Sequence, residues 1–339
     1  MRPVRRAGVA ALMCVAASHV GMHDLGAQTT AGNCATASFG GLSGADACVK
    51  ARDIFAFVMP QVGVALSGGN PVLGEGGTLG GWGKRAISAR VTAVDGRVPG
   101  NVVPIRLIGA TSSNFGANRA PVPVPSVDAA IGLFAGVPAG LTNIGGVDVL
   151  LGATYLPAVS ESGFSVAPQT SSVALSYGVR VGALQESSLV PGLSVSFMRR
   201  KLPTTTLGYT AGNDSISVRN LAVTSNSLRV VASKRVALFG LAAGVGRDQL
   251  ENTAGVDAVV NEPVLNQQTR ALVSLFGLRN AVTRNTAFVN VSLGLSIARI
   301  VGEFGWSAAG AEDPTINTFD GRQANEGYRY GSLGLTVRF

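Results

Sequence analysis

The sequence has little charge, few aromatic residues and no long uninterrupted apolar segment. Charged residues make up 14% of the 339 residues and aromatic residues 6%, whereas about a quarter of an ordinary soluble domain is charged. A membrane-spanning helix needs about 20 apolar residues. Beyond residue 27 the best candidate, 129–159, contains eight glycines or prolines and Asp148. A mean hydropathy of +0.33 therefore comes from neither a helical membrane protein nor a disordered chain.

Histidine is confined to the first 27 residues, as His19 and His23. That segment begins with three arginines, continues with an apolar stretch at 7–17, and ends in Leu25-Gly26-Ala27. This pattern is typical of a secretory signal peptide, so we expect 1–27 to be removed. The remaining chain then lacks histidine, which excludes a Ser-His-Asp triad and a histidine metal site. We expect no enzyme activity, no catalytic residues, no cofactor and no metal.

The remaining charge and the glycines indicate no nucleotide or nucleic-acid site. Without the signal segment the net charge is about +6, but no basic patch is interleaved with aromatic residues, so we expect no nucleic-acid partner. The glycine-rich segment 74–84 has Thr78 and Arg85 where a phosphate-binding loop needs glycine and a hydroxyl residue. We interpret this segment as a flexible surface loop.

Two cysteines remain after export, Cys34 and Cys48. In an oxidising compartment a Cys34–Cys48 disulfide is the expected pairing. The stretch 45–58 is rich in alanine and free of glycine and proline, and Pro60 follows it, so one short helix is predicted there. The segment 28–59 is expected to be an N-terminal unit that either lies in the periplasm or plugs the lumen of a barrel.

From residue 60 onward apolar and polar residues alternate with the period of a β-strand. In 171–182, five apolar residues face one way and small or polar residues the other. Strands of ten or more residues, with short and long connections in turn, favour a membrane-spanning barrel over a soluble sandwich. The fold class predicted for 60–339 is therefore all-β, a transmembrane antiparallel up-and-down β-barrel of about 12 strands, or 14 if 192–233 forms two hairpins. Either number places both termini on the periplasmic side.

The expected strands and connections can be stated by residue. For the 12-stranded barrel the strands are 61–67, 83–93, 102–109, 126–135, 144–155, 171–182, 192–210, 215–233, 236–248, 268–279, 285–304 and 328–339. Long connections are expected at 68–82, 110–125, 156–170, 249–267 and 309–327. Short ones are expected at 94–101, 136–143, 183–191, 234–235 and 280–284.

Six arginines fall on the polar side of their expected strands: Arg90, Arg106, Arg180, Arg200, Arg219 and Arg229. In a barrel they face the lumen, since a charge on the lipid face costs about 2–4 kcal/mol at mid-depth. Two interpretations stay open. The arginines pair with acids or backbone and fill a narrow interior, or they line a pore that favours anions.

The last residues of the chain end in an aromatic residue preceded by apolar residues at alternate positions. The residues concerned are Tyr330, Leu333, Leu335, Val337 and Phe339. This pattern resembles the C-terminal assembly signal of Gram-negative outer-membrane β-barrel proteins. The resemblance covers about a dozen residues and implies export through the periplasm and insertion by the outer-membrane assembly machinery. Outer-membrane lipid and that machinery are thus the expected partners, and the outer membrane of a Gram-negative bacterium is the expected location.

Three functions remain open on the sequence. The leading hypothesis is an outer-membrane barrel that acts as a passive channel or transporter for small solutes, with 28–59 partly blocking it. The second is a non-conducting barrel with a structural or adhesive role, and the third a secreted all-β binding protein.

Overall fold

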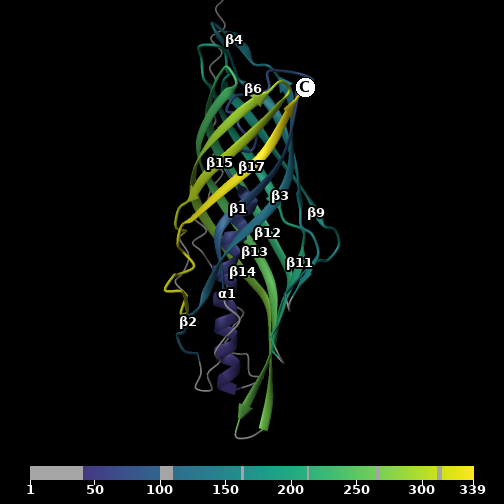
Figure 1. The fold of residues 1–339 in the computed structure, drawn as a ribbon, viewed down its shortest axis with the longest axis vertical. Helices are drawn as coiled ribbons and strands as arrows, with labels where there is room; N and C mark the ends of the chain where they lie inside the picture. Colours follow the sequence, from purple (N-terminus) through teal and green to yellow (C-terminus); the bar gives the residue numbers. More distant parts are fainter. Residues whose placement is uncertain (1–40, 100–109, 162–163, 212–213, 265–266, 311–314) are drawn as a thin grey trace, which may run out of the picture.

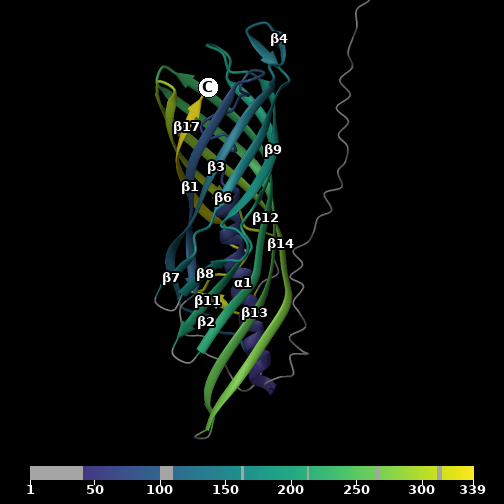
Figure 2. The same ribbon diagram turned by 90° about the vertical axis from the view of Figure 1, so that its right-hand side faces the viewer.

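The computed structural model describes residues 41–99, 110–161, 164–211, 214–264, 267–310 and 315–339. These residues form a tall closed barrel of antiparallel strands with one long helix inside it (Figures 1 and 2). Among them, no helix is both long and apolar enough to cross a membrane. The predicted signal peptide 1–27 lies outside the described residues.

Ten of the described strands close the ring in the order β1-β3-β6-β9-β10-β12-β13-β14-β15-β17, and β17 pairs back with β1. Their bounds are β1 Arg85–Pro99, β3 Ala117–Phe134, β6 Gly146–Tyr155, β9 Val173–Leu184, β10 Gly192–Lys201, β12 Asp214–Val236, β13 Phe239–Val264, β14 Gln267–Leu295, β15 Ala298–Ser307 and β17 Tyr328–Arg338. An all-β barrel is confirmed, with ten strands in the ring instead of the expected 12 or 14.

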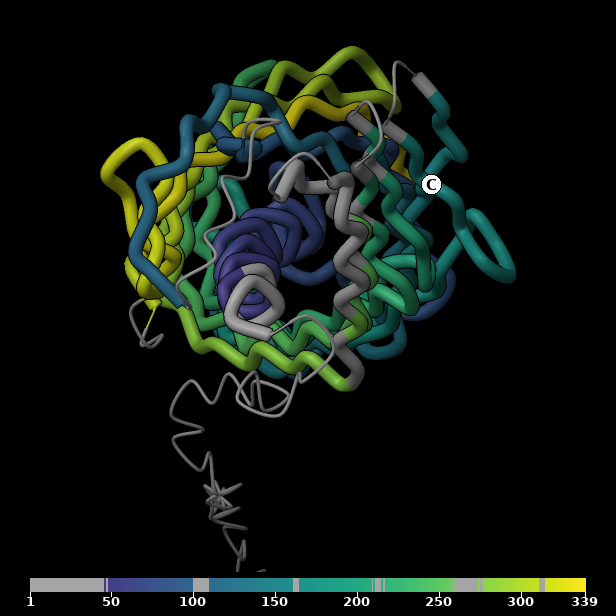
Figure 3. The backbone as a smooth tube through the Cα atoms, turned by 90° about the horizontal axis from the view of Figure 1, so that it is seen from below, coloured from purple at the N-terminus to yellow at the C-terminus, as the bar shows by residue number. Residues whose placement is uncertain are grey.

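The remaining elements are one helix and several short strands. The helix α1 (Gly41–Ser67) lies inside the ring, as the view along the barrel shows (Figure 3). The others are β2 Asn114–Phe115, β4 Val137–Ala139, β5 Thr142–Ile144, β7 Val159–Glu161, β8 Phe164–Pro168, β11 Thr205–Ala211 and β16 Thr318–Phe319. Strands β11, β8 and β7 extend the sheet from the outer part of β12, while β4–β5 and β2–β16 form separate pairs.

Two of the shortest turns lie at the end of the barrel that carries Phe339, and two long connections lie at the other end (Figure 1). Turns of two residues join β12 to β13 and β14 to β15 at the Phe339 end. The connections between β6 and β9 and between β15 and β17 are long and lie at the opposite end, which we call the outer end. This distribution follows the rhythm of outer-membrane barrels, whose short turns face the periplasm.

An unbroken apolar surface surrounds the half of the barrel nearest Phe339. Every ring strand contributes large apolar side chains that are more than a third exposed. We call this surface the belt; its members include Ile87, Val91, Val127, Leu151, Leu175, Val179, Val195, Phe197, Leu228, Val230, Leu241, Val245, Val289, Val291, Ile300, Phe304, Leu333 and Leu335. A soluble monomer rarely exposes a contiguous apolar patch above a few hundred Å², so the belt needs an apolar solvent.

The polarity of the two faces of the wall reverses beyond the belt. On β12, Ser227 and Arg229 point inward at belt level, but Leu221 and Val223 are the buried residues closer to the outer end. Strands β13 and β14 do the same, with Leu250, Ala254, Leu278 and Val282 buried inside. Leu221 and Val223, which stand at positions where the alternation of this strand otherwise has polar residues, therefore belong to an apolar core inside the barrel. This core lies where the outside of the barrel meets water.

The helix α1 is longer than predicted because Pro60 does not end it. Proline lacks an N–H and normally disrupts the i to i−4 ladder. Here Nε2 of Gln61 donates to the carbonyl of Phe57 at 3.0 Å and to that of Arg97 at 3.1 Å, which ties the helix to β1 just after the proline. The strand predicted at 61–67 is thus wrong: these residues continue the helix to Ser67. The helix begins at Gly41, at the outer end (Figure 2). The expected start of the exported chain at residue 28 lies outside the described residues.

Two further predictions about the wall are corrected. The expected turn at 280–284 lies inside β14, and the expected long connection at 249–267 belongs mostly to β13 and β14, which have 26 and 29 residues. These parts of the strands resemble loop sequence because, beyond the belt, their outward side chains are polar and their inward side chains are apolar. The expected short connection at 94–101 continues as β1 to Pro99, and the strand expected at 102–109 lies outside the described residues.

Along 117–125, one edge of β3 has no neighbour among the described strands. Strand β6 pairs with β3 only from Ser126 onward, whereas β1 pairs with it from Ala117 to Ile131. The N–H of Gly132 donates to the carbonyl of Lys84, beside β1. Even-numbered residues of β3 therefore direct their N–H groups toward β1, and odd-numbered residues direct theirs away. Pro121, Pro123 and Pro125 all occupy positions on the open side, where proline removes no ladder hydrogen bond.

Candidate functional site: an occupied lumen

The segment that connects α1 to β1 runs through the lumen at belt level. We call residues 68–84 the lumenal loop. All residues of 68–79 are buried, and the chain emerges at the Phe339 end where Trp82 is 82% exposed. The expectation of a flexible surface loop at 74–84 is wrong for its first half. Polar side chains of the wall at this level, which we call the polar tier, hold the loop by its backbone.

Glu303 on β15 binds the start of the lumenal loop. Its carboxylate accepts hydrogen bonds from the N–H groups of Gly69 at 3.0 Å and Asn70 at 2.8 Å. The same carboxylate accepts from Nδ2 of Asn290 at 2.7 Å and from the hydroxyl of Ser332 at 3.1 Å. Four donors satisfy one buried carboxylate, and bonds of this charge-assisted kind are the strong ones in proteins.

Arg229 on β12 binds the same stretch through its carbonyl groups. Its guanidinium donates to the carbonyls of Gly68 at 2.9 Å and Gly69 at 3.1 Å and forms an ion pair with Asp248 at 2.7 Å. Both side chains are almost fully buried. Glu303 and Arg229 thus bind the donors and the acceptors of neighbouring peptide groups.

The other lumenal arginines share this arrangement. Arg90 donates to the carbonyl of Asn70 at 2.8 Å and pairs with Asp128 at 3.1 Å, and Arg200 pairs with the same Asp128 at 2.6 Å. Arg180 pairs with Asp148 at 2.7 Å. These arginines point into the lumen, but each faces a carboxylate on the wall, and none of them lines an open aqueous surface.

Further along, the lumenal loop has a second set of anchors. The N–H of Gly76 donates to the hydroxyl of Ser233 at 2.8 Å, and the N–H of Leu79 lies 3.1 Å from a carboxylate oxygen of Asp148. Glu75 of the loop forms ion pairs with Arg338 at 3.1 Å and Arg299 at 3.4 Å, near the Phe339 end. The loop is therefore tied to the wall along its buried length by polar contacts.

Near the outer end, apolar contacts replace polar ones. Phe55, Met59 and Leu66 of α1 belong to a buried cluster with residues of β1, β3, β12, β13 and β14. The ring of Phe57 stacks on Phe319 at a centroid distance of 4.1 Å. Leu250 and the other buried wall residues of this level form what we call the apolar tier; its wall members include Val94, Val124, Leu221, Val223, Leu250, Ala254, Leu278 and Val282.

Several predicted residues lie elsewhere or cannot be placed. Arg219 pairs with Asp257 and is partly exposed, away from the polar tier. Arg106 and Cys34 lie outside the described residues, so the Cys34–Cys48 disulfide stays a prediction; Cys48 itself is buried in α1. Leu333, Leu335 and Phe339 are exposed on the outer face, whereas Tyr330 is buried on the inner face. The backbones of Phe339 and Arg85 bond reciprocally at 3.0 and 3.2 Å and help close the ring.

The predictions from the sequence did not identify the carboxylates that pair with the arginines, and they did not place the lumenal loop inside the barrel. Glu303, Asp128, Asp148 and Asp248 stand on the same inward phase of their strands as the arginines, so the alternation that found the arginines could also have found them. No sequence pattern identifies the partner, because the loop is bound through its backbone groups. In the described parts of the chain, no group of histidine, cysteine, aspartate and glutamate side chains is arranged to hold a metal ion.

No protein-family model matches the chain, and no curated protein matches it. Solved structures give matches of very low identity. The chain is similar to the translocator domain of the autotransporter NalP from Neisseria meningitidis, at 13% identity and a TM-score of 0.32, covering 76% of this chain and 89% of that one. It is similar to the outer-membrane protease OmpT from Escherichia coli, at 13% identity and a TM-score of 0.32, covering 76% and 96%.

A third match is an anion-selective porin from Comamonas acidovorans, at 10% identity and a TM-score of 0.17, covering 76% of this chain and 98% of that one. All three are outer-membrane β-barrels with different activities. The TM-scores are below 0.5, so these similarities carry no functional argument.

Proposed function

We propose that the protein is an outer-membrane β-barrel that passes small solutes through its lumen when the lumenal loop leaves the polar tier. The single observation that carries this proposal is the chemistry of the loop contacts. Gly69, Asn70 and Gly76 are held by hydrogen bonds to Glu303 and Ser233. Water can replace such bonds. The neutral bond to Ser233 contributes about 1 kcal/mol, and each charge-assisted bond to Glu303 about 1.5–3 kcal/mol.

The belt supports the membrane assignment within this proposal. All ten ring strands expose apolar side chains at one level, and the short turns lie at the Phe339 end, which we assign to the periplasm. The expected export, assembly machinery and Gram-negative outer membrane belong to the same proposal. No catalytic role is proposed for this chain.

The paired arginines suggest which ions an open lumen favours. Arg90 and Arg229 each donate to loop carbonyls in the closed barrel. Displacement of the loop removes those carbonyls and also removes the carboxylate of Glu75 from the neighbourhood of Arg299 and Arg338. We therefore expect a weak anion preference, measurable as the sign of the reversal potential in a planar bilayer under a KCl gradient.

Gly76→Ala tests the role of the loop directly. A Cβ at residue 76 meets the backbone nitrogen of Ser233 at 2.5 Å and the carbonyl carbon of Ala232 at 2.6 Å. Since strand backbone cannot give way, the loop must move and lose its bond to Ser233. We expect the fraction of time spent conducting to rise about fivefold, the equivalent of one hydrogen bond of about 1 kcal/mol.

Gly302→Ala is the matched control. A Cβ at residue 302 has no neighbour within 4 Å among the described residues, so its conductance should equal that of the original protein. Equal conductance in both variants would show that the loop is no gate. The absence of conductance and of sugar-driven liposome swelling in all three proteins would favour a non-conducting structural or adhesive barrel. A soluble periplasmic protein in cell fractionation would favour the secreted alternative.

A further inference from the structure

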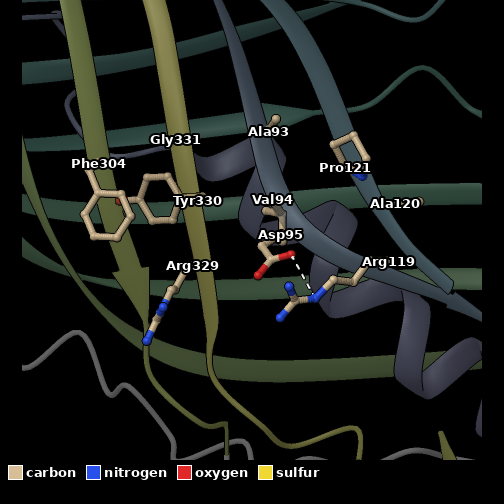
Figure 4. A pocket seen from close by; sticks show the side chains of 10 residues that line it. All are labelled: Ala93, Val94, Asp95, Arg119, Ala120, Pro121, Phe304, Arg329, Tyr330 and Gly331. Carbon is tan, nitrogen blue, oxygen red and sulfur yellow. Dashed lines mark ion pairs between the residues drawn. The ribbon is translucent and has the colours of Figure 1, made fainter. Parts of the chain in front are cut away.

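A groove of about 440 Å³ crosses the outer face of β3, β1, β17 and β15 (Figure 4). Its floor and walls include Ala93, Pro121, Phe304 and Gly331. The side chains of Asp95, Arg119 and Arg329 stand at one end of the groove, as Figure 4 shows. The groove is thus apolar along its length and charged at one end.

The strand register places this groove at the outer boundary of the belt. Ala93 pairs with Gly331, and Asp95 pairs with Pro121 on the other side of β1. Outward-facing positions between Ile87 and Ala93 are apolar, and Asp95 is the next one. On β17 the outward residues from Val337 to Gly331 are apolar or glycine, and Arg329 follows. The charged end of the groove therefore lies at the depth of lipid headgroups, and the apolar part lies at the depth of acyl chains.

Small residues create the groove between larger neighbours. Ala93 and Gly331 lie side by side in the ladder, and Phe304 on β15, 58% exposed, forms the adjacent wall. A Cβ at residue 331 would meet only the carbonyl oxygen of Glu303, at 3.6 Å. The space above Gly331 is thus open to the surrounding lipid and can accept a chain of methylene groups.

The charge at the end of the groove is not balanced by this chain. Asp95 and Arg119 are 4.0 Å apart and both more than half exposed, and an ion pair of that kind contributes little to stability. Arg329 has no ion pair or side-chain hydrogen bond with any residue that the structure describes. This end of the groove thus carries two guanidinium groups and one carboxylate. Guanidinium groups bind phosphate oxygens with two parallel N–H donors, which suits a phosphate headgroup.

We propose that this groove is a binding site for a phosphorylated membrane lipid. The lipid phosphate binds Arg329 and Arg119, and one acyl chain lies along Ala93, Gly331 and Phe304. The proposal rests on the membrane assignment made above, since only then does the groove face lipid. It specifies a lipid and not a free anion because the floor is apolar and continuous with the belt.

The test measures lipid retention by the full barrel purified in detergent. The probes are dimyristoyl phosphatidic acid and dimyristoyl phosphatidylcholine, and native mass spectrometry counts the lipids bound at increasing concentrations. The barrel should retain one phosphatidic acid at concentrations about tenfold lower than phosphatidylcholine. Arg329→Gln and Arg119→Gln should each remove most of this preference, because each deletes a charge-assisted contact to the phosphate.

Two further variants separate the site from general surface charge. Lys201→Gln removes an exposed cation from β10, across the ring, and should leave the preference unchanged. Gly331→Leu fills the floor without a backbone clash and should lower retention of both lipids at this site. If Lys201→Gln and Arg329→Gln reduce retention equally, the preference is nonspecific and the proposal fails.

Two other results would also contradict the proposal, for different reasons. Inorganic phosphate at millimolar concentration should not displace the lipid; full displacement would show a simple anion site. Flotation with vesicles checks the membrane assignment independently. A barrel that does not float refutes that assignment, whereas a barrel that floats but binds both lipids equally refutes the lipid site alone.

Discussion

The polar tier and the apolar tier of the lumen hold two consecutive pieces of the same chain by opposite means. Around the lumenal loop, Arg229 and Glu303 bind backbone groups through charge-assisted hydrogen bonds, and Asp248 pairs with Arg229. Around α1, Leu250 and its neighbours pack against Phe55 and Met59. The wall strands are common to both tiers, so the strand geometry does not cause the difference.

The solvent outside the wall explains this contrast. A strand crossing the belt must place its apolar side chains outward toward lipid, so its inner face is left with polar residues, which need partners. Where the same strand leaves the belt, its outer face meets water, and apolar residues return to the inside as in a soluble protein. The helix fits the second environment, and a glycine-rich backbone with many free N–H and C=O groups fits the first.

The largest expected effect comes from breaking the polar tier with Arg229→Met. This change leaves the buried carboxylate of Asp248 without its main cation and removes donors from two loop carbonyls. Removing one partner of a buried ion pair costs about 3–5 kcal/mol. Urea-induced unfolding of the barrel in lipid vesicles, followed by tryptophan fluorescence, measures the loss.

The matched control for that variant is Arg229→Met combined with Asp248→Leu. Without the orphaned charge, the double variant should recover much of the stability, since apolar replacement of a whole buried pair is often neutral. If the free energy of unfolding of the single variant is no lower than that of the double variant, ion pairing does not hold the polar tier together. The contrast between a polar and an apolar tier would then be wrong.

A somewhat smaller effect is expected from Leu250→Ala in the apolar tier. Leu250 is 1% exposed and lies against α1 near Gly63, so the truncation leaves a cavity and costs about 2–4 kcal/mol. Hydrogen exchange should accelerate in α1 more than in the lumenal loop. Leu241→Ala on the same strand is the control, because Leu241 is 60% exposed on the belt and its truncation opens no cavity. Equal losses in both variants would contradict a buried core at the outer end.

The smallest effect concerns Glu186, in the short connection between β9 and β10. Burial raises the pKa of this carboxyl, but the hydrogen bonds and charge of Arg235 and the hydroxyl of Ser233 outweigh burial, so the pKa lies below its ordinary value. A carboxyl with a lowered pKa in the folded state stabilises the fold above its unfolded pKa, about 4.3. This contribution is lost as the pH falls through the folded pKa.

Glu186→Gln checks that expectation. The variant should be slightly less stable than the original protein at pH 7, and the difference should shrink toward zero at pH 3. Unfolding in urea at both pH values measures it, with the belt and α1 untouched. A difference that is the same at both pH values would show that the carboxylate charge does not contribute.

The period of two was enough to predict most of the wall. It predicted that Arg90, Arg180, Arg200 and Arg229 face inward, because a strand cannot change the side of a residue without a register shift. In the structure all four side chains are buried. The alternation was misleading where a strand leaves the belt and its outer face meets water instead of lipid. Leu221 and Val223 look like errors of phase in the sequence, but they mark the level at which β12 leaves the belt.

The helix and the lumenal loop were the least predictable parts. Val62, Val64 and Leu66 alternate as in a strand, yet a helix enclosed by the ring is apolar on most sides and shows no clear helical stripe. Pro60 looked like a helix end because proline removes the N–H that bonds to the carbonyl four residues earlier. The packing of α1 inside the ring nevertheless keeps the helix continuous through it. The Cys34–Cys48 disulfide and the removal of 1–27 remain predictions.

The three prolines on the open side of β3 have a mechanical consequence. Among the described strands, residues 117–125 of β3 pair with β1 only. A force that pulls this part of β3 away from the side opposite β1 therefore breaks no backbone hydrogen bond there. The missing donors also deny a docking template to a strand from another molecule. The barrel thereby contains one line of weaker backbone pairing, without exposing an edge that promotes aggregation.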